Sequence, residues 1–177
     1  KDPLSLRREL LAASPRHLRV LELAADRSGW ATPPPAGVAR GIALVAAFGS
    51  LIAEVAEVTE SEGQIRVLRV GCVLDCGQTV NPETVQAQIE GGVVFGLTAT
   101  LKSAITLADG QVEQSGFADF PLLRCDETPE IEVHLVPSEA TPGGVSGLGT
   151  AAIAPAVANA VFALTGQPVR ALPIRLG

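Results

Sequence analysis

Apolar and polar positions repeat with a helical period over the first 30 residues. From Pro15 onward, leucine, valine and alanine recur every three or four positions, and charged residues fill the positions between them. This amphipathic pattern predicts a helix that ends at Ser28-Gly29. A shorter helix is expected before it, because Asp2-Pro3 combines an N-cap residue with a proline at the first helical position.

Strand-like runs dominate the next segment. Residues 41–47 form a short apolar run, as expected of a buried strand. Residues 51–59 and 64–74 are typical of a hairpin around Glu60-Ser61-Glu62-Gly63. Partial alternation in the second of these runs indicates a half-buried antiparallel pair.

Helices and short strands alternate in the second half of the chain. Asn81-Pro82-Glu83 predicts the start of a helix that runs to about Leu101, and the apolar residues 151–165 predict a second helix closed by Gly166. Alternation over residues 131–135 predicts a strand. The weaker predictions are a hairpin of 105–107 and 112–114 around Asp109-Gly110, an irregular segment or short strand at 117–123, and a strand at 169–174 that would close the sheet.

The order of these elements predicts an α+β fold, with a mostly antiparallel or mixed sheet packed with helices. We expect a short N-terminal helical appendage at residues 1–30, a Pro-rich linker at 31–40 and one main domain at 41–177. The chain has 177 residues, 47% of them hydrophobic and 18% charged. These values are typical of a globular chain that buries a core, and they exclude a disordered one.

Charge and cysteine content narrow the function classes. The net charge of −6, without a Lys/Arg cluster, argues against nucleic acid as a partner. Two histidines and three cysteines do not match a zinc spacing, so no metal site is predicted. Cys72 and Cys76 lie too far apart on a strand to bridge, and all three cysteines are expected to be buried free thiols. No targeting segment or membrane span is visible, which predicts a soluble chain and leaves the cytoplasm and the periplasm both open.

Glycines concentrate between Pro142 and Thr150, at four of seven consecutive positions. A glycine loop that opens a helix exposes free N–H groups at the positive end of the helix dipole, which suits an anion, a phosphate or an oxyanion. A tight connection into a core helix explains the same pattern without any ligand.

Three more glycines, Gly91, Gly92 and Gly96, lie inside the helix predicted from Asn81. Each costs about 1 kcal/mol relative to alanine in a helix interior. Close approach of another backbone or of a bulky ligand would justify this cost. A tight helix–helix crossing is the alternative without a ligand.

Two functional interpretations of the glycine loop fail on the sequence. Gly143, Gly147 and Gly149 are spaced as in the cofactor loop of short-chain dehydrogenases, but only 28 residues follow Gly149 and the chain has no tyrosine for that family's catalytic motif. Ser146 is not a hydrolase nucleophile, because Leu148 stands where Gly-x-Ser-x-Gly needs its second glycine and no histidine follows.

Taken together, segments along the whole chain resemble the C-terminal part of the molybdenum-binding large subunit of the xanthine dehydrogenase/aldehyde oxidase family. Within that family, the sequence most resembles the isoquinoline 1-oxidoreductase and membrane-bound aldehyde dehydrogenase branch. The segments that carry the resemblance are 1–4, 48–50, 53–58, 75–77 with 81–82, 86–92, 95–97, 120–124, 129–133, 142–145 and 154–160.

The resemblance implies a cofactor, molybdopterin, alone or as its cytosine dinucleotide form. It implies that Gln88 lies against this cofactor, and that Gly144, Val145, Ser146 and Gly147 line it with their N–H groups. It also implies that the chain is one segment of a larger subunit, partnered by the remainder of that subunit and by an iron–sulfur small subunit. The isolated piece would expose its cofactor-facing helix, so self-association is expected.

One departure from the family pattern concerns catalysis. The family loop reads Gly-Val-Gly-Glu-Pro-Gly-Thr and its Glu is the general base, whereas Gly147 occupies that position here. General-base catalysis typically contributes 10²–10⁴-fold. We therefore name no catalytic residue and expect weak or absent activity, with Glu139 an unfavoured substitute. The alternative is a non-catalytic structural or partner-binding relative without the cofactor.

Overall fold

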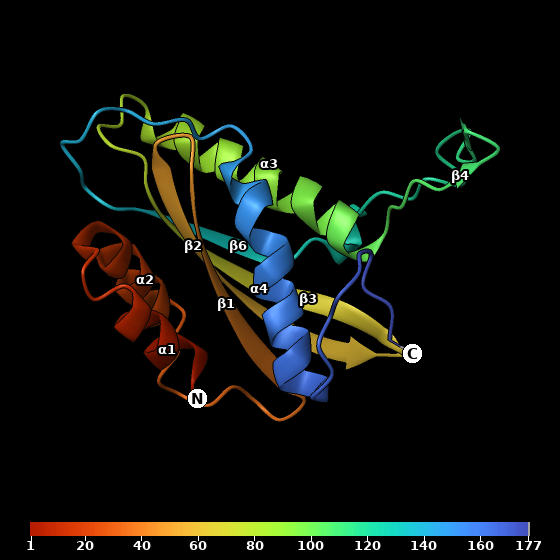
Figure 1. The fold of residues 1–177 in the computed structure, drawn as a ribbon, viewed down its shortest axis with the longest axis horizontal. Coiled ribbons are helices and arrows are strands. Elements are labelled where there is room, and N and C mark those ends of the chain that lie inside the picture. Colours follow the sequence, from red (N-terminus) through yellow and green to blue (C-terminus); the bar gives the residue numbers. More distant parts are fainter. Residues whose placement is uncertain (177) are drawn as a thin grey trace.

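The computed structural model describes residues 1–176 and confirms the α+β class. A four-stranded mixed sheet, ordered β1-β2-β3-β6, has helices on both faces (Figure 1). Strands β1, β2 and β3 pair antiparallel, and β6 pairs parallel to β3. The strands are β1 (Val38–Ala47), β2 (Ser50–Ser61), β3 (Gln64–Asp75), β4 (Leu107–Ala108), β5 (Gln111–Val112) and β6 (Glu130–Leu135). The helices are α1 (Pro3–Leu10), α2 (Pro15–Arg27), α3 (Pro82–Leu101) and α4 (Leu148–Thr165), with a 3-10 turn at Cys125–Glu127.

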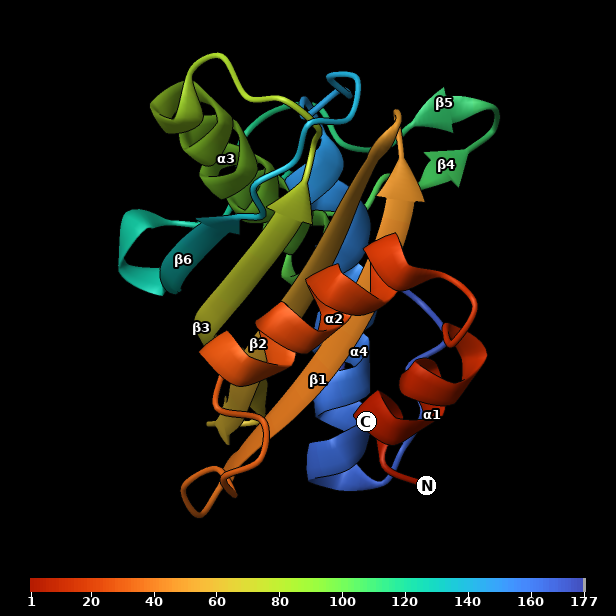
Figure 2. The ribbon, with the colours of Figure 1, turned by 90° about the vertical axis from the view of Figure 1, so that its left-hand side faces the viewer.

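The two N-terminal helices cover one face of the sheet, where α2 runs across the strands (Figure 2). Its apolar stripe, led by Val20 and Leu21, is fully buried against Val55 and Val73 of the sheet. Both helices therefore share a hydrophobic core with the strands. Strand β1 begins at Val38, inside the segment that the sequence assigns to the linker.

The larger core lies on the opposite face, beneath α3 and α4. Helix α4 lies along β1 at close range, because a Cβ at Gly41 would be only 2.2 Å from the Ala156 carbonyl oxygen. The side-chain amide of Asn159 donates to the carbonyl of Ile42 at 3.0 Å, which fastens the helix to this strand. Helix α4 is long and apolar enough to span a membrane, but here its buried residues pack on the sheet and on α3, as in the core helix of a soluble domain.

The helix glycines mark the crossing of α3 and the N-terminal end of α4 (Figure 1). A Cβ at Gly92 would lie 3.3 Å from the Cα of Gly149, and a Cβ at Gly96 would lie 2.4 Å from a side-chain methyl of Ile153. A tight helix–helix crossing therefore accounts for these two positions. Gly91 differs, because a Cβ there would meet no atom within 4 Å.

Two expectations for the C-terminal part are wrong. Helix α4 begins at Leu148 and not at Ala151, so the last glycine of the loop lies inside the helix. Residues 169–174 form no strand. Instead, the Ile174 N–H donates to the Thr100 carbonyl at 2.7 Å, because the end of α3 offers unpaired carbonyl groups to this proline-containing segment.

A thin arm leaves the body at the end of α3 and carries the small β4–β5 hairpin (Figure 1, right). Asp109 and Gly110 form its turn with φ of 50° and 77°, as the Asp-Gly pair predicts. Residues 117–123 that return from it contain no strand, in agreement with the irregular alternative.

Candidate functional site

Gln88 lies on the exposed side of α3, in the N-terminal half of that helix. The helix starts there because the Asn81 side chain accepts a hydrogen bond from the Thr84 N–H at 3.1 Å and Pro82 occupies its first position. Gln88, Gly91 and Phe95 follow at helical spacing, so they share one face. Phe95 is 71% exposed on that face.

The glycine loop is held between two turns of the sheet. The Gly143 N–H donates to the Cys76 carbonyl and the Gly144 N–H donates to the Phe48 carbonyl, each at 2.8 Å. A Cβ at Gly144 would lie 2.9 Å from the Phe48 Cβ, so the close approach requires glycine. These two glycines serve the packing of the loop against the β1–β2 turn.

Gly147 is the N-cap of α4 and has a left-handed conformation, with φ of 79°. No side chain caps the helix at this end. Within residues 1–176, the N–H groups of Val145, Ser146 and Gly147 donate to no protein acceptor. The Thr150 hydroxyl donates to the Gly92 carbonyl at 2.9 Å and ties this end of α4 to α3.

A shallow hollow of about 420 Å³ opens where the two helices meet. Its lining residues are Ala87, Gln88, Gly91, Gly92, Phe95, Gly147 and Thr150. Gln88 and Gly147, predicted site residues 59 positions apart in the sequence, therefore share one hollow. Gly144, Val145 and Ser146 are not part of its lining. Val145 packs against the main core instead.

None of the described residues that line this hollow is ionisable. Glu139 is exposed and also does not line it. Among residues 1–176 no group of three His, Cys, Asp or Glu side chains is placed to hold a metal ion. The hollow can therefore supply amide and N–H hydrogen bonds and an aromatic face, but no proton acceptor of catalytic strength.

An ion pair that the sequence analysis missed supports the chain segment next to the glycine loop. Arg16 of α2 donates to both carboxylate oxygens of Asp75, at 2.7 and 2.9 Å, and Asp75 also accepts from the Gly77 N–H at 3.0 Å. The hydrogen bond from Arg16 is the main cause that lowers the pKa of Asp75 to about 2. The Gln78 N–H then donates to the Ala140 carbonyl at 2.9 Å, just before the glycine loop. No local motif signals this pair, because its partners lie 59 residues apart.

Glu54 and Cys72 are buried ionisable groups beneath α3 and α4 that do not line the hollow. Glu54 on β2 is completely buried, and neither of its carboxylate oxygens has a partner in the described chain. Burial raises the pKa of Glu54 well above its usual value. It faces Cys72 on β3, whose pKa burial also raises. Cys72, Cys76 and Cys125 are free thiols, as expected, but Cys125 is exposed and not buried.

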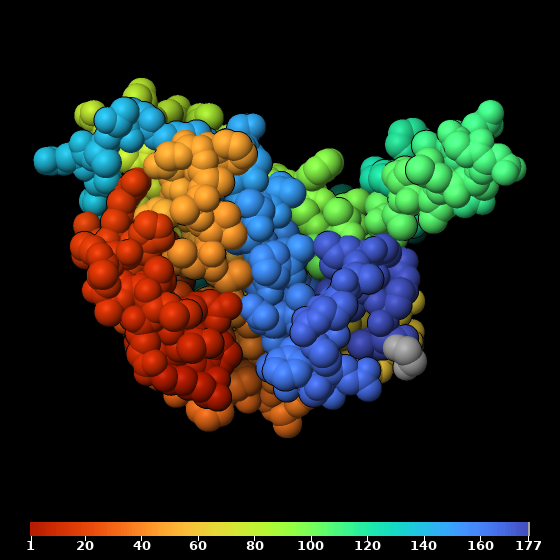
Figure 3. Space-filling model, viewed as in Figure 1, coloured from red at the N-terminus to blue at the C-terminus, as the bar shows by residue number. Residues whose placement is uncertain are grey.

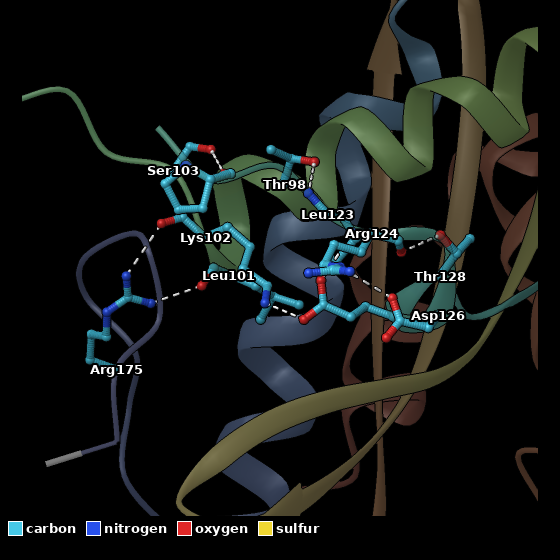
Figure 4. Close-up of polar contacts among 11 residues, drawn as sticks. Thr98, Leu101, Lys102, Ser103, Leu123, Arg124, Asp126, Thr128 and Arg175 are labelled. Atoms are coloured by element: carbon cyan, nitrogen blue, oxygen red, sulfur yellow. Dashed lines mark hydrogen bonds and ion pairs between the residues drawn. The ribbon is translucent and has the colours of Figure 1, made fainter. Parts of the chain in front are cut away.

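A larger polar hollow, of about 560 Å³, lies at the C-terminal end of α3. There Lys102 pairs with Glu127, and the Arg175 guanidinium donates to the carbonyls of Leu101 and Lys102 at 2.8 and 3.3 Å (Figure 4). The carbonyls at the end of a helix need such donors. We therefore assign Arg175 to the anchoring of the C-terminal segment.

Known proteins resemble this chain in sequence and in fold. The chain is 37% identical to the beta subunit of isoquinoline 1-oxidoreductase from Brevundimonas diminuta, over 98% of this chain and 23% of that protein. It is 31% identical to one subunit of nicotinate dehydrogenase from Pseudomonas putida, over 98% of this chain and 16% of that protein. The fold is similar to CO dehydrogenase of Oligotropha carboxidovorans, with a TM-score of 0.57 and 26% identity over 66% of this chain and 16% of that one.

These matches confirm the resemblance to the molybdenum-binding large subunit of the xanthine dehydrogenase/aldehyde oxidase family. The chain spans about a quarter or less of the length of these curated relatives, which are themselves named as subunits. Residues 16–129, which include all but the first residue of α2, the three antiparallel strands and all of α3, match the family described as the molybdopterin cofactor-binding domain. The chain therefore belongs to the family of molybdopterin cofactor-binding domains.

Proposed function

We propose that this chain is one segment of the large subunit of a molybdenum-dependent oxidoreductase that hydroxylates an aldehyde or an N-heterocycle. Two relatives support the heterocycle, since their names refer to isoquinoline and nicotinate. Because the chain spans only part of those proteins, the complete enzyme would need the remainder of the large subunit. An iron–sulfur small subunit would then receive the electrons.

The proposed cofactor is molybdopterin, alone or as its cytosine dinucleotide form, bound at the hollow between α3 and α4. When bound, it supplies the redox-active metal and a phosphate. The hollow fits a flat polar group, because Gly91 and Gly147 leave backbone without a Cβ beside the Gln88 amide. The N–H groups of Val145, Ser146 and Gly147 at the positive end of α4 suit an anionic oxygen.

Three residues of the hollow have distinct proposed roles. Gln88 would orient the cofactor through its amide, which both donates and accepts hydrogen bonds. Gly91 would let the cofactor approach the helix backbone. Phe95, exposed beside them, would exclude water from one side of the bound group.

We further propose that catalysis is weak or absent. The observation that carries this proposal is the lining of the hollow, which includes Gln88 and Gly147 and no carboxylate among the described residues. Without a proton acceptor, the chain would bind and orient the cofactor but would not remove the proton on which the reaction depends. A non-catalytic relative, retained as a structural or partner-binding domain, is the second candidate and is favoured by the same missing carboxylate.

The test is the molybdenum and pterin content of the native assembly, purified through this chain. We expect close to one molybdenum and one pterin for each chain. Gln88→Ala should lower the pterin content, whereas Gln86→Ala should not, because Gln86 is also an exposed glutamine of α3 but bonds to Glu90. An assembly without molybdenum and without pterin would exclude the enzyme and leave the non-catalytic relative.

A further inference from the structure

The arm of residues 103–123 exposes large apolar side chains without any cover in the described chain. It protrudes from the body, as the space-filling view shows (Figure 3, upper right). Its exposed apolar residues are Ile105 (57%), Leu107 (70%), Val112 (53%), Phe117 (88%) and Leu122 (49%). Soluble proteins rarely leave so many neighbouring apolar side chains in water unless another surface covers them.

Internal hydrogen bonds give the arm a defined shape. The side-chain amide of Gln114 accepts from the Thr106 N–H at 2.8 Å and donates to the Thr106 hydroxyl at 2.9 Å. The Asp119 carboxylate accepts from the N–H groups of Ser115 and Gly116 at 2.8 and 2.9 Å. The arm is therefore organised before it meets a partner, which lowers the entropy cost of docking.

The base of the arm is fixed to the body. The Ser103 hydroxyl donates to the Pro121 carbonyl at 2.6 Å and closes the two ends of the arm. The Leu123 N–H donates to the Thr98 hydroxyl of α3 at 3.2 Å (Figure 4). Because its base is closed and anchored, the arm projects from the body in a fixed direction.

The charge of the arm indicates the chemistry of its partner. Residues 103–123 contain Asp109, Glu113 and Asp119 and no lysine or arginine. A matching surface would combine an apolar cleft with basic residues at its rim. A second copy of this chain is disfavoured as the partner, because two acidic arms on chains of net charge −6 repel each other.

We propose that the arm docks into an apolar cleft with a basic rim, in the part of the large subunit that lies outside these 177 residues. Relatives are about four times as long as this chain or longer, since it spans 23% and 16% of two of them, so most of such a subunit is available to cover the arm. This inference rests on the proposed function in one respect only, the existence of that larger subunit.

Photocross-linking in the native assembly tests the docking. Phe117, in the arm, is replaced by p-benzoylphenylalanine, and Leu10 of α1, which is 74% exposed, receives the same substitution as the control. After irradiation of intact source cells, mass spectrometry identifies the linked peptides. We expect the Phe117 position to link to a peptide of the same large subunit outside residues 1–177, and the Leu10 position not to link to that peptide.

A second variant tests the basic rim. Asp109→Lys combined with Glu113→Lys reverses two exposed charges without touching an apolar side chain. This double variant should lower the yield of the Phe117 cross-link several-fold. When the purified assembly is irradiated at high salt, the yield should be restored in part, because screening weakens the repulsion.

Four results would overturn the proposal: a link to residues 1–177 of a second copy, a link to the small subunit, a link to an unrelated protein, or no link. The outcome is independent of cofactor content. An assembly that gives the expected link but holds no molybdenum would contradict the proposed function and leave the docking in place. An assembly that holds molybdenum and pterin but gives no Phe117 link would contradict the docking and leave the proposed function in place.

Discussion

Gly92 of α3 and Gly149 of α4 lie backbone against backbone, with the Gly149 Cα 3.3 Å from the position that a Cβ on Gly92 would occupy. In the other direction, a Cβ on Gly149 would be 2.5 Å from the Ile89 carbonyl oxygen. This contact sets the distance between the two helices. Because Gln88 and Gly147 lie directly beside it on their own helices, the contact also brings them to one hollow.

Gly149→Ala should destabilise the fold by about 1–3 kcal/mol, because the new methyl group meets backbone atoms that cannot move independently. Urea unfolding of the two purified proteins measures the difference. Gly91→Ala is the matched control on the open side of α3. It should stabilise by up to about 1 kcal/mol, since alanine favours the helix and a Cβ there meets nothing within 4 Å. Equal effects of both substitutions would contradict the close crossing.

Arg175→Ala should lower stability by about 1 kcal/mol, because the carbonyls of Leu101 and Lys102 lose their donor at the end of α3. Amide hydrogen exchange should show faster opening in the last turn of α3 and little change in its first turn. Arg170→Ala is the control, as Arg170 donates only to the neighbouring Val169 carbonyl. If both variants open the helix end equally, the guanidinium of Arg175 does not hold it.

Acid should weaken the support of the glycine loop through Asp75. Its pKa is about 2 in the folded chain, below the ordinary value of 3.8, mainly because of the hydrogen bond from Arg16. A lowered folded pKa adds stability that is fully present above the unfolded pKa and is lost as pH falls towards 2. Since Arg16 is partly exposed to solvent, we expect on the order of 1–2 kcal/mol from this pair.

The variant Arg16→Gln isolates this contribution. It should lower stability at pH 7 and flatten the change in unfolding free energy between pH 5 and pH 2, measured by urea unfolding at each pH. An Arg16→Gln protein that keeps the full acid dependence of the wild type would show that another carboxylate is responsible.

Glu54 should give the opposite dependence on pH. Burial raises its folded pKa, so the folded state holds a proton that the unfolded state releases. Stability from this group is therefore complete below the unfolded pKa and falls as pH rises above it. Glu54→Gln cannot ionise and should be more stable than the wild type by about 1–3 kcal/mol at pH 8. Equal stability of the two proteins from pH 4 to pH 9 would contradict this.

The sequence predicts those elements whose signals are local. Asn81-Pro82 identifies the start of α3, and Asp109-Gly110 identifies the turn of the arm, because caps and turns depend on a few adjacent residues. Parallel pairing of β6 with β3 was not specified, since their contact joins segments about 60 residues apart. A strand was expected at residues 169–174, yet this segment forms none and its Ile174 N–H donates to the Thr100 carbonyl at the end of α3.

The candidate site was predictable in part for the same reason. The glycines of α3 indicated a close approach, but only the structure separates Gly92 and Gly96, which face α4, from Gly91, which lies open in the hollow. Ala87 and Phe95 were missed as lining residues, because only the fold brings their side of α3 beside the N-terminal end of α4. The buried position of Glu54 was equally hidden, since a central strand covered on both faces removes the usual alternation of polar and apolar residues.

Gly147→Glu should restore a proton acceptor to the hollow. A Cβ at this position meets no atom within 4 Å, so the side chain has room, but the φ of 79° costs a non-glycine residue about 1–2 kcal/mol. If the native assembly holds molybdenum and pterin, turnover of isoquinoline or of an aromatic aldehyde should rise by about 10²–10⁴-fold over the wild type, the usual contribution of a general base.

Gly147→Gln separates the base from the shape of the side chain. It carries the same backbone cost and nearly the same volume, yet its amide cannot take up the proton, so turnover should stay at the wild-type level. Both variants are first matched for molybdenum and pterin content. A gain shared by Glu and Gln would mean that bulk at the N-terminus of α4, and not proton transfer, was missing. No gain with Glu in a fully loaded assembly would favour the non-catalytic relative.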